Sequence, residues 1–204
     1  MIIVRCNDIN QAWRKTMKEL YLNGYTPQDT RFYKMDTVVI EIEKPKLCEP
    51  DSLFPITKEN IDIINHFITT GENEDKVCHE WTKLYYHRLF DEPNSQIKYM
   101  IDRIKKDRMG IAANWIKEDQ NHEIKPCMLS ITASAEHSKL NLQLHARASN
   151  TYDKLLMNIL EFVALQKYIA DQCGLEQGRF TMFIDYAQIK ATDKVAVEKI
   201  INTK

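Results

Sequence analysis

Residues 126–147 read PCMLSITASAEHSKLNLQLHAR, in which two runs of alternating apolar and polar residues flank the polar turn EHSK. This pattern predicts an antiparallel hairpin with strands over 128–135 and 140–146. Cys127 and Arg147 then lie opposite each other at the open end of the hairpin. The thiol is either a small apolar filler or an attacking group, and the surrounding residues must decide between the two.

Helices and further strands are predicted on both sides of this hairpin. The segment 151–173 is apolar almost all round, which predicts a helix running through the core. Aromatic residues are dense over 80–90, which indicates a semi-buried patch. The other predicted helices cover 9–23, 57–70, 95–106 and 194–201, and the other strands cover 36–43, 109–116 and 179–189. This order favours an α+β fold with a mixed sheet on the long helix, in one domain over 1–204.

Composition excludes several classes of function. The chain has 204 residues, 28% of them charged, with a formal net charge of −1. Such a balance provides no general field for a nucleic acid polymer or an anionic membrane. No apolar run reaches the roughly 18 residues that a bilayer requires. Five scattered cysteines without a C-x-x-C pair argue against a disulfide framework, so we expect a cytoplasmic protein, and no metal set at zinc-like spacing is apparent.

Two further residues have two possible interpretations each. A guanidinium at Arg147 would stabilise the thiolate of Cys127, which is the nucleophilic form, or it is a solvated charge at a strand end. Asn158 is an amide inside a run of core residues, and leaving it unpaired costs about 1–3 kcal/mol. Either backbone or water satisfies it, or it binds a ligand such as a pyrimidine ring, which has both a donor and an acceptor edge.

These residues together resemble the thymidylate synthase superfamily, in its compact archaeal-type branch. The spacing from the cysteine to the arginine, and from the arginine to the asparagine, matches the family without gaps. The resemblance covers 80–202 well and 1–79 weakly. Its motifs are Pro126-Cys127, Leu140-x-Leu-Gln-Leu-x-x-Arg147, Asn158-Ile159 and Ile169-Ala-Asp-Gln-Cys-Gly-Leu-Glu-x-Gly178.

The resemblance implies folate-dependent transfer of a one-carbon unit to C5 of a pyrimidine nucleotide. Cys127 would add to C6, and 5,10-methylenetetrahydrofolate would supply the carbon. It also implies a homodimer with a two-fold axis through the sheet, because Arg108 would reach the phosphate in the partner's site. The residues expected in the site are Cys127, Arg147 and Tyr85 for catalysis, Arg108, Asn158, Gln188, Lys190 and Ser149 for the substrate, and Asn150 and Trp81 for the folate. As an alternative, Arg108 and Lys190 are solvated charges, and Tyr85 and Trp81 are plain core aromatics.

The sequence departs from the family at several of these positions. Ala148 and Asn150 replace a serine and an aspartate, and Gln188 and Lys190 replace a histidine and a tyrosine. The catalytic glutamate expected in the helix before Gly71 has no clear counterpart. Ile64 falls near its place, whereas Glu59 or Glu72 would need a shift.

We therefore expect a divergent member of the superfamily that still activates the pyrimidine but binds the sugar and the folate differently. A methyl or a hydroxymethyl product is possible, on a uridylate or a cytidylate. A nucleotide-binding paralogue without turnover is a second hypothesis, because of the missing glutamate. A transferase acting on a precursor without a phosphate is a third, because few arginines remain.

Overall fold

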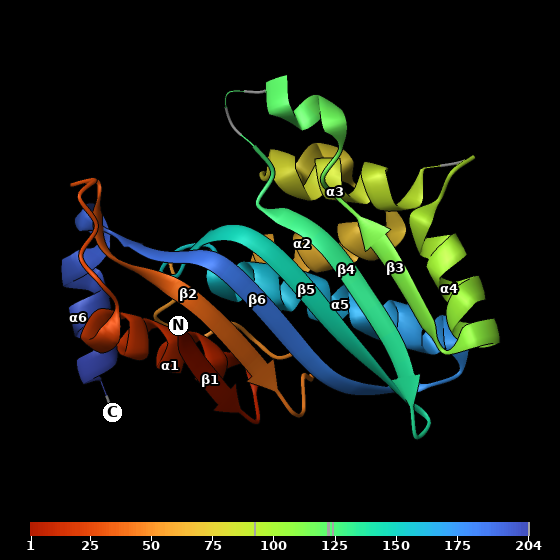
Figure 1. Cartoon of the computed structure of the whole chain (residues 1–204), viewed down its shortest axis with the longest axis horizontal. Coiled ribbons are helices and arrows are strands. Elements are labelled where there is room, and N and C mark those ends of the chain that lie inside the picture. The colour runs from red at the N-terminus through yellow and green to blue at the C-terminus, as the bar shows by residue number, and fades with distance from the viewer. Residues whose placement is uncertain (92, 122, 124, 204) are drawn as a thin grey trace.

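The computed structural model describes residues 1–91, 93–121, 123 and 125–203. Six strands form one sheet in the order β1-β2-β6-β5-β4-β3 (Figure 1). The two central strands, β5 and β6, are parallel, and so are β1 and β2, while the other pairs are antiparallel. The sheet is thus mixed, as expected. The strands are β1 (Ile2–Cys6), β2 (Phe32–Ile42), β3 (Met109–Ala113), β4 (Met128–Glu136), β5 (Lys139–Asn150) and β6 (Glu176–Lys190).

The hairpin of β4 and β5 forms in the predicted register. Met128 pairs with Ala146, and the backbone N–H of Arg147 donates to the carbonyl of Cys127 at 2.7 Å. The register shifts by one residue between Met128 and Ser130. A bulge of this kind re-aims the residues next to it. The bulge lies directly after Cys127, at the start of β4, next to the site described below.

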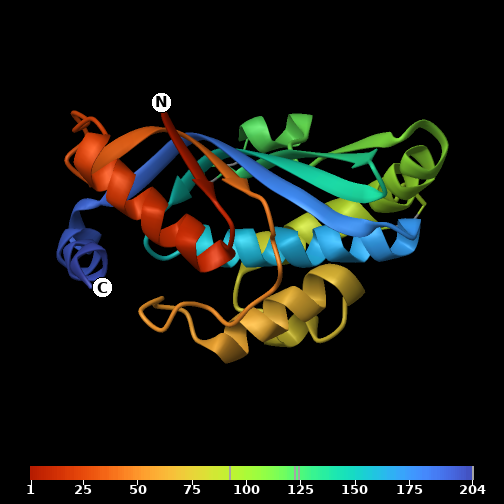
Figure 2. The same cartoon turned by 90° about the horizontal axis from the view of Figure 1, so that it is seen from below.

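The helices lie on one face of the sheet. Figure 2 shows α5 and α1 directly beneath the strands and α2 in a further layer. Because α5 lies between the sheet and α2, it is buried on nearly every side, which explains its uniformly apolar sequence and confirms the expected core helix. The helices are α1 (Ile9–Asn23), α2 (Lys58–Thr70), α3 (Glu80–Phe90), α4 (Gln96–Asp107), α5 (Leu155–Cys173) and α6 (Lys194–Asn202).

One buried side chain joins α5 to the sheet. The amide of Gln166 donates to the carbonyls of Leu140, Gly178 and Arg179. The register of β5 against β6 shifts at this point, which interrupts the ladder. Gln166 therefore satisfies carbonyls beside the irregularity and fixes the position of α5 along the strands.

Several elements differ from the sequence-based expectations, and β2, β3 and β6 do so at their ends, covering 32–42, 109–113 and 176–190 instead of 36–43, 109–116 and 179–189. The strand β1 was not predicted, because its five residues have no turn signal before them. The aromatic segment 80–90 is a regular helix, α3. Within it the ring of Tyr86 stacks on that of Phe90, with 4.7 Å between the ring centroids. The core helix begins at Leu155 instead of 151, because residues 151–154 form turns.

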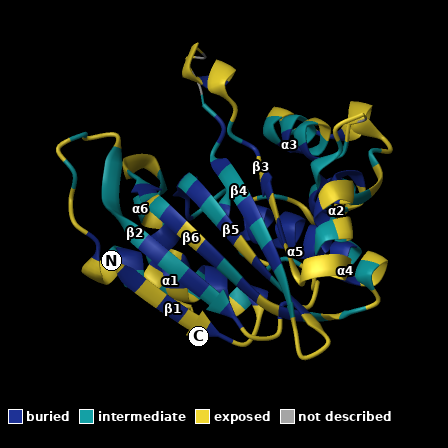
Figure 3. Cartoon of the chain, turned by 45° about the vertical axis from the view of Figure 1, so that its right-hand side comes forward, coloured by how far each residue is buried: buried dark blue, intermediate teal, exposed yellow. Residues whose placement is uncertain are grey.

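The other face of the sheet carries no α-helix in the part of the chain that the structure describes. Its residues alternate with the buried ones along each strand, as Figure 3 shows. Ile3, Ile111 and Phe183 are large apolar residues exposed on this face, and His145 forms an ion pair with Asp185 there. We call this surface the open face. Among the described helices, none has the length and apolar character needed to cross a bilayer.

Candidate functional site

A cavity of about 140 Å³ lies where β4 begins, β5 ends and α5 begins. Helix α3 closes its other side. The cavity brings together residues that are far apart in the sequence, including six of the ten expected site residues. Its lining consists of His79, Trp81, Thr82, Tyr85, Cys127, Ala148, Ser149, Asn150, Lys154, Met157, Asn158 and Glu161.

Tyr85 holds the segment that carries the thiol. Its hydroxyl oxygen accepts hydrogen bonds from the backbone N–H groups of Cys127, at 3.1 Å, and Met128, at 3.2 Å. The side chain is 3% exposed, and its ring stacks on that of Trp81 at 6.5 Å between centroids. Since the hydroxyl accepts in both bonds, its own proton remains available to a group in the cavity.

The thiol of Cys127 faces the cavity and is only partly buried. Burial raises its pKa above the usual value, while the positive charges of Arg147 and Lys154 lower it. Arg147 therefore favours the thiolate as expected, because its charge lowers the pKa of Cys127. In the free chain, however, burial raises this pKa by more than the charges lower it. An anionic nucleophile at this position depends on the two cations.

Arg147 does not line the cavity, although its charge acts on Cys127. Its guanidinium donates to the carbonyl of Lys125 at 3.2 Å, and its buried Nε has no hydrogen-bond partner among the described residues. A buried N–H without a partner is costly, which favours an acceptor arriving with a ligand. A phosphate oxygen is an acceptor that suits a guanidinium.

Two polar side chains line the cavity close to the start of α5. Asn158 is 7% exposed, and Ser149 is buried with its hydroxyl oxygen unpaired. The chain thus places an amide and a free hydroxyl beside the thiol, as the resemblance implies. These groups provide both donors and acceptors for a small polar ring.

Sequence reasoning missed Glu161, which also lines the cavity. Its side chain is 0% exposed, and neither carboxyl oxygen has a hydrogen-bond partner. Burial raises its pKa to about 8, and only the nearby Thr82 hydroxyl acts in the opposite sense. A signal was present in the sequence, because Asn158 and Glu161 are three residues apart and so share one face of an apolar helix.

Lys154 and His79 form a second polar group that was not anticipated. The ammonium of Lys154 lies 3.2 Å from Nδ1 of His79, and both residues line the cavity. Burial, and next the charge of Lys154, lower the pKa of His79. A neutral imidazole accepting from Lys154 at Nδ1 agrees with this direction. The Lys154–His79 pair thus places a positive charge at the N-terminus of α5, near the thiol of Cys127.

Two of the residues assigned to folate and sugar, Asn150 and Lys190, are held by carboxylates. The amide nitrogen of Asn150 donates to both Asp153 and Asp193, so its two N–H groups are already used. Lys190 forms an ion pair with the same Asp153 at 3.2 Å. The backbone carbonyl of Gln188 accepts from Thr151, and neither Gln188 nor Lys190 lines the cavity.

Arg108 lies far from the thiol of its own chain. It ends α4 in the left-handed conformation, with φ of 67°, and the next residue, Met109, pairs with Ser134 near the turn of the hairpin. At about 3.3 Å per strand residue, roughly 20 Å separates this end of β4 from Cys127. Arg108 is exposed.

The three positions considered for the expected glutamate lie outside the cavity. Ile64 is buried in α2, Glu59 is exposed in the first turn of α2, and Glu72 contacts His66 at 3.1 Å on the surface. Helix α2 therefore contributes no carboxyl group to the cavity. Nor do three or more His, Cys, Asp or Glu side chains gather as metal ligands within the described residues.

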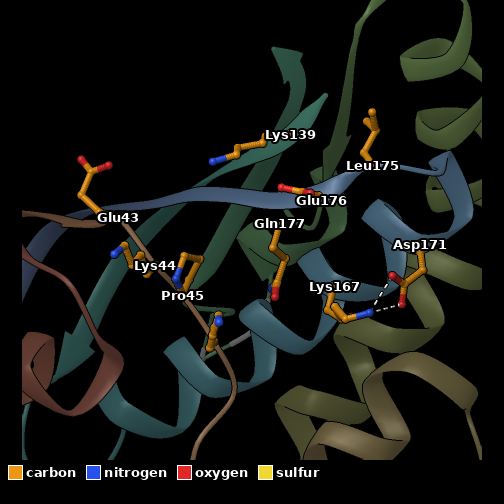
Figure 4. A pocket seen from close by; sticks show the side chains of 10 residues that line it. Glu43, Lys44, Pro45, Lys139, Lys167, Asp171, Leu175, Glu176 and Gln177 are labelled. Carbon is orange, nitrogen blue, oxygen red and sulfur yellow. Dashed lines mark hydrogen bonds and ion pairs between the residues drawn. The ribbon is translucent and has the colours of Figure 1, made fainter. Parts of the chain in front are cut away.

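A larger cavity, of about 650 Å³, lies at the opposite end of the sheet (Figure 4). It is lined by Lys139 at the start of β5 and by Lys167 and Asp171 in the second half of α5. Lys167 and Asp171 form an ion pair with each other. Its lysines are mixed with carboxylates, and Cys127 is at the other end of the hairpin. The size of a cavity therefore does not identify the site here, whereas its chemical groups do.

The electrostatics of Cys127 predict how fast the thiol reacts. Replacing Lys154→Met removes a charge that lowers the pKa of Cys127, so less thiolate is present at pH 8. We expect alkylation of Cys127 by iodoacetamide to become several-fold slower, followed by peptide mass spectrometry with exposed Cys78 as the internal reference. The control is Lys167→Met, which removes a lysine from α5 away from the cavity. Equal rates in both variants would contradict the assigned role of Lys154.

Comparisons with known proteins identify the family and the fold. The family model "Thymidylate synthase" matches residues 51–204. A protein of Methanococcoides burtonii named "Putative thymidylate synthase" is 24% identical over 98% of this chain and 94% of its own length. A Fusobacterium nucleatum thymidylate synthase is 26% identical over 59% of this chain and 47% of its own. In fold, the chain is similar to thermostable thymidylate synthase A from Bacillus subtilis, with a TM-score of 0.74 and 14% identity over 97% of this chain and 85% of that one. The chain is a divergent member of the thymidylate synthase family.

Proposed function

We propose that this protein transfers a one-carbon unit from 5,10-methylenetetrahydrofolate to C5 of a pyrimidine nucleotide, through a covalent adduct of Cys127. The observation that carries the proposal is the single cavity in which the thiol of Cys127, the amide of Asn158 and the free hydroxyl of Ser149 meet. Family membership supports a transferase. The assignment of Cys127 as the nucleophile, and of Asn158 and Ser149 as the groups that can orient a polar ring, is supported by their positions in the cavity.

The size of the cavity supports a ring-shaped occupant. At about 140 Å³ it is smaller than the roughly 300–1,000 Å³ of typical ligand pockets. A pyrimidine ring would fill the buried part, between Asn158 and the thiol. The sugar and phosphate would then lie beside Lys154, which lines the cavity, and within reach of Arg147, since both positive charges act on Cys127.

The chemistry begins with the thiolate. Addition of Cys127 to C6 converts the ring into a C5 nucleophile and divides one difficult substitution into easier steps. Tyr85 positions the thiol by binding the backbone on either side of its Cα. A phosphate bound by Arg147 would fill the partner-free site at Nε and fix the distance between C6 and sulfur.

The residues beside the cavity fit a folate. Trp81 lines the cavity and, stacked on Tyr85, gives a flat aromatic surface for a pterin ring. Asn150 is engaged, but the carboxylates of Asp153 and Asp193 that hold it provide acceptors for ring N–H groups. The folate would supply the one-carbon unit at the oxidation level of formaldehyde, and the protein would position the acceptor carbon.

A homodimer through the open face is part of the same proposal. That face is uncovered and presents Ile3, Ile111 and Phe183. Arg108 is too far from Cys127 of its own chain to bind the same nucleotide, but a two-fold axis can bring it to the partner's site.

Three alternatives follow from particular observations. A hydroxymethylase would add water, not hydride, to the same intermediate. The altered residues Asn150, Gln188 and Lys190 favour this hydroxymethyl product over the methyl product. A paralogue that only binds nucleotides would follow from the absence of a carboxyl group from α2. A precursor without a phosphate is a third candidate substrate, because Lys154 lines the cavity and Arg147 does not.

The reaction is tested by the release of tritium from C5-labelled UMP, dUMP, CMP and dCMP in the presence of methylenetetrahydrofolate. At least one nucleotide should lose its label, because C5 exchanges its hydrogen for carbon. Cys127→Ser should abolish release, while Cys78→Ser, at an exposed thiol outside the cavity, should leave it unchanged. If the wild type releases no label from any of the four, the nucleotide transferase is wrong. Unchanged binding of a nucleotide by Cys127→Ser would then favour the paralogue.

The dimer is tested by mixing two inactive variants. Arg108→Ala should lack the phosphate contact, and Cys127→Ser the nucleophile. In a mixed dimer one of the two sites has both residues intact, so subunit exchange should restore about a quarter of the wild-type activity. Mixing Cys127→Ser with Arg147→Ala is the control, because Arg147 serves its own chain's site, so neither site of a mixed dimer is intact and no activity should return. Sedimentation as a monomer would overturn the shared site.

A further inference from the structure

The carboxyl group of Glu161 is the most unusual group in the molecule. It is fully buried in α5 and lines the cavity with Cys127, and in the described part of the chain neither oxygen has a partner within hydrogen-bond geometry, although the Thr82 hydroxyl lies near enough to lower its pKa. A buried carboxylate without a partner is costly, so such a group is either neutral or waiting for a ligand. A purely structural glutamate in a core helix would bond to a backbone group or a cation.

Among the residues that the structure describes, no base or cation is hydrogen-bonded to Glu161. Helix α2 packs on α5 with the apolar residues Ile61, Ile64, Phe67 and Ile68. Helix α3 contributes Thr82 and Tyr85, whose pKa is raised by burial first and then by Cys127 and Glu161. The remaining titratable groups of the cavity are Cys127, His79 and Lys154, and none is hydrogen-bonded to Glu161.

The position of Glu161 completes what the site lacks. The carboxyl group that was expected from the helix before Gly71 is absent from the cavity, where α2 has Ile64 in its place. Addition of sulfur to C6 of a pyrimidine puts negative charge on the ring acceptor conjugated with C5. A neutral acid in a water-poor cavity is suited to give that acceptor a proton.

We propose that Glu161 is a catalytic residue of this site, a neutral carboxylic acid that donates its proton to the pyrimidine ring as Cys127 adds to C6. This rests on the proposed function. It also relocates the site's carboxyl group from α2 to α5, to the turn that carries Asn158. Asn158 and Glu161 would together contact the polar edge of the ring.

The proposed step balances as follows. Cys127 first loses its proton to solvent through the cavity opening. The thiolate then forms the S–C6 bond, the C5–C6 π electrons move onto the ring, and the proton of Glu161 passes to O4 of a uracil or N3 of a cytosine. Glu161 is left as a carboxylate. When C5 bonds to the one-carbon unit of the folate, that proton returns to Glu161.

The state of Glu161 is tested without substrate. A carboxyl group with a folded pKa of about 8, against about 4.3 unfolded, stabilises the fold fully below pH 4.3 and loses that contribution as the pH rises to 8. The unfolding equilibrium constant of the wild type should therefore rise by up to about tenfold more per pH unit than that of Glu161→Gln in this window. Asp171→Asn, on the surface of the same helix, should keep the wild-type slope. Equal slopes in the wild type and Glu161→Gln would overturn the neutral acid.

The catalytic role is tested by the tritium assay on the same variants, after circular dichroism has shown that they fold. Glu161→Gln should lose at least about 100-fold in release, Glu161→Asp should recover part of it, and Asp171→Asn should match the wild type. Release by the wild type should decline above pH 8, and the residual release of Glu161→Gln should not. If the wild type and Glu161→Gln release label equally, Glu161 has no such role although the proposed function stands. If the wild type is inactive on all four nucleotides, both fail.

Discussion

The hydroxyl of Tyr85 binds two successive backbone N–H groups, those of Cys127 and Met128, and the geometry of the site depends on this contact. Without it the bulge after Met128 would leave the start of β4 free to pair differently. The same helix also fixes the segment before the cysteine, because Arg88 forms a buried two-point ion pair with Asp119. Helix α3 thus determines where the thiol stands relative to α5.

Burial explains the electrostatics of the cavity as a whole. A low dielectric raises the pKa of the thiol, the phenol and the carboxyl group, and lowers that of the imidazole. In the free chain these groups therefore tend to be neutral, while Lys154 and Arg147 supply positive charge at the edge. An arriving anion would meet those cations, and a ring would meet neutral donors. Such a cavity suits a reaction in which charge develops on the ring and not on the protein.

Much of the fold could be predicted from the sequence, because its signals are local. The alternation in residues 126–147 fixed the hairpin and its register, and the apolar run fixed α5 as the core helix. The strand β1 was missed, since five residues at a sheet edge are recognised only through their partner β2. The start of α5 at Leu155 reflects turns at 151–154, which periodicity cannot reveal.

The resemblance to a family predicted part of the lining of the site, and it did not reveal the residues that only packing brings there. Cys127, Asn158, Ser149, Asn150, Tyr85 and Trp81 do line one cavity. Glu161 was overlooked because a glutamate in a helix is ordinarily solvated, and only the packing of α2 and α3 on α5 shows that this one is enclosed. His79 and Lys154 meet across 75 positions of sequence, a contact that no local pattern encodes.

The central claim is that the sulfur of Cys127 bonds to C6 of a pyrimidine. It is tested most directly by incubating the protein with the 5-fluoro analogue of whichever nucleotide releases tritium, together with methylenetetrahydrofolate. Fluorine cannot leave C5 as a cation, so the adduct should accumulate. Mass spectrometry after denaturation and digestion should find the nucleotide and folate masses together on the peptide that contains Cys127. An unmodified Cys127 peptide, or the added mass on another residue, would contradict covalent catalysis at this thiol.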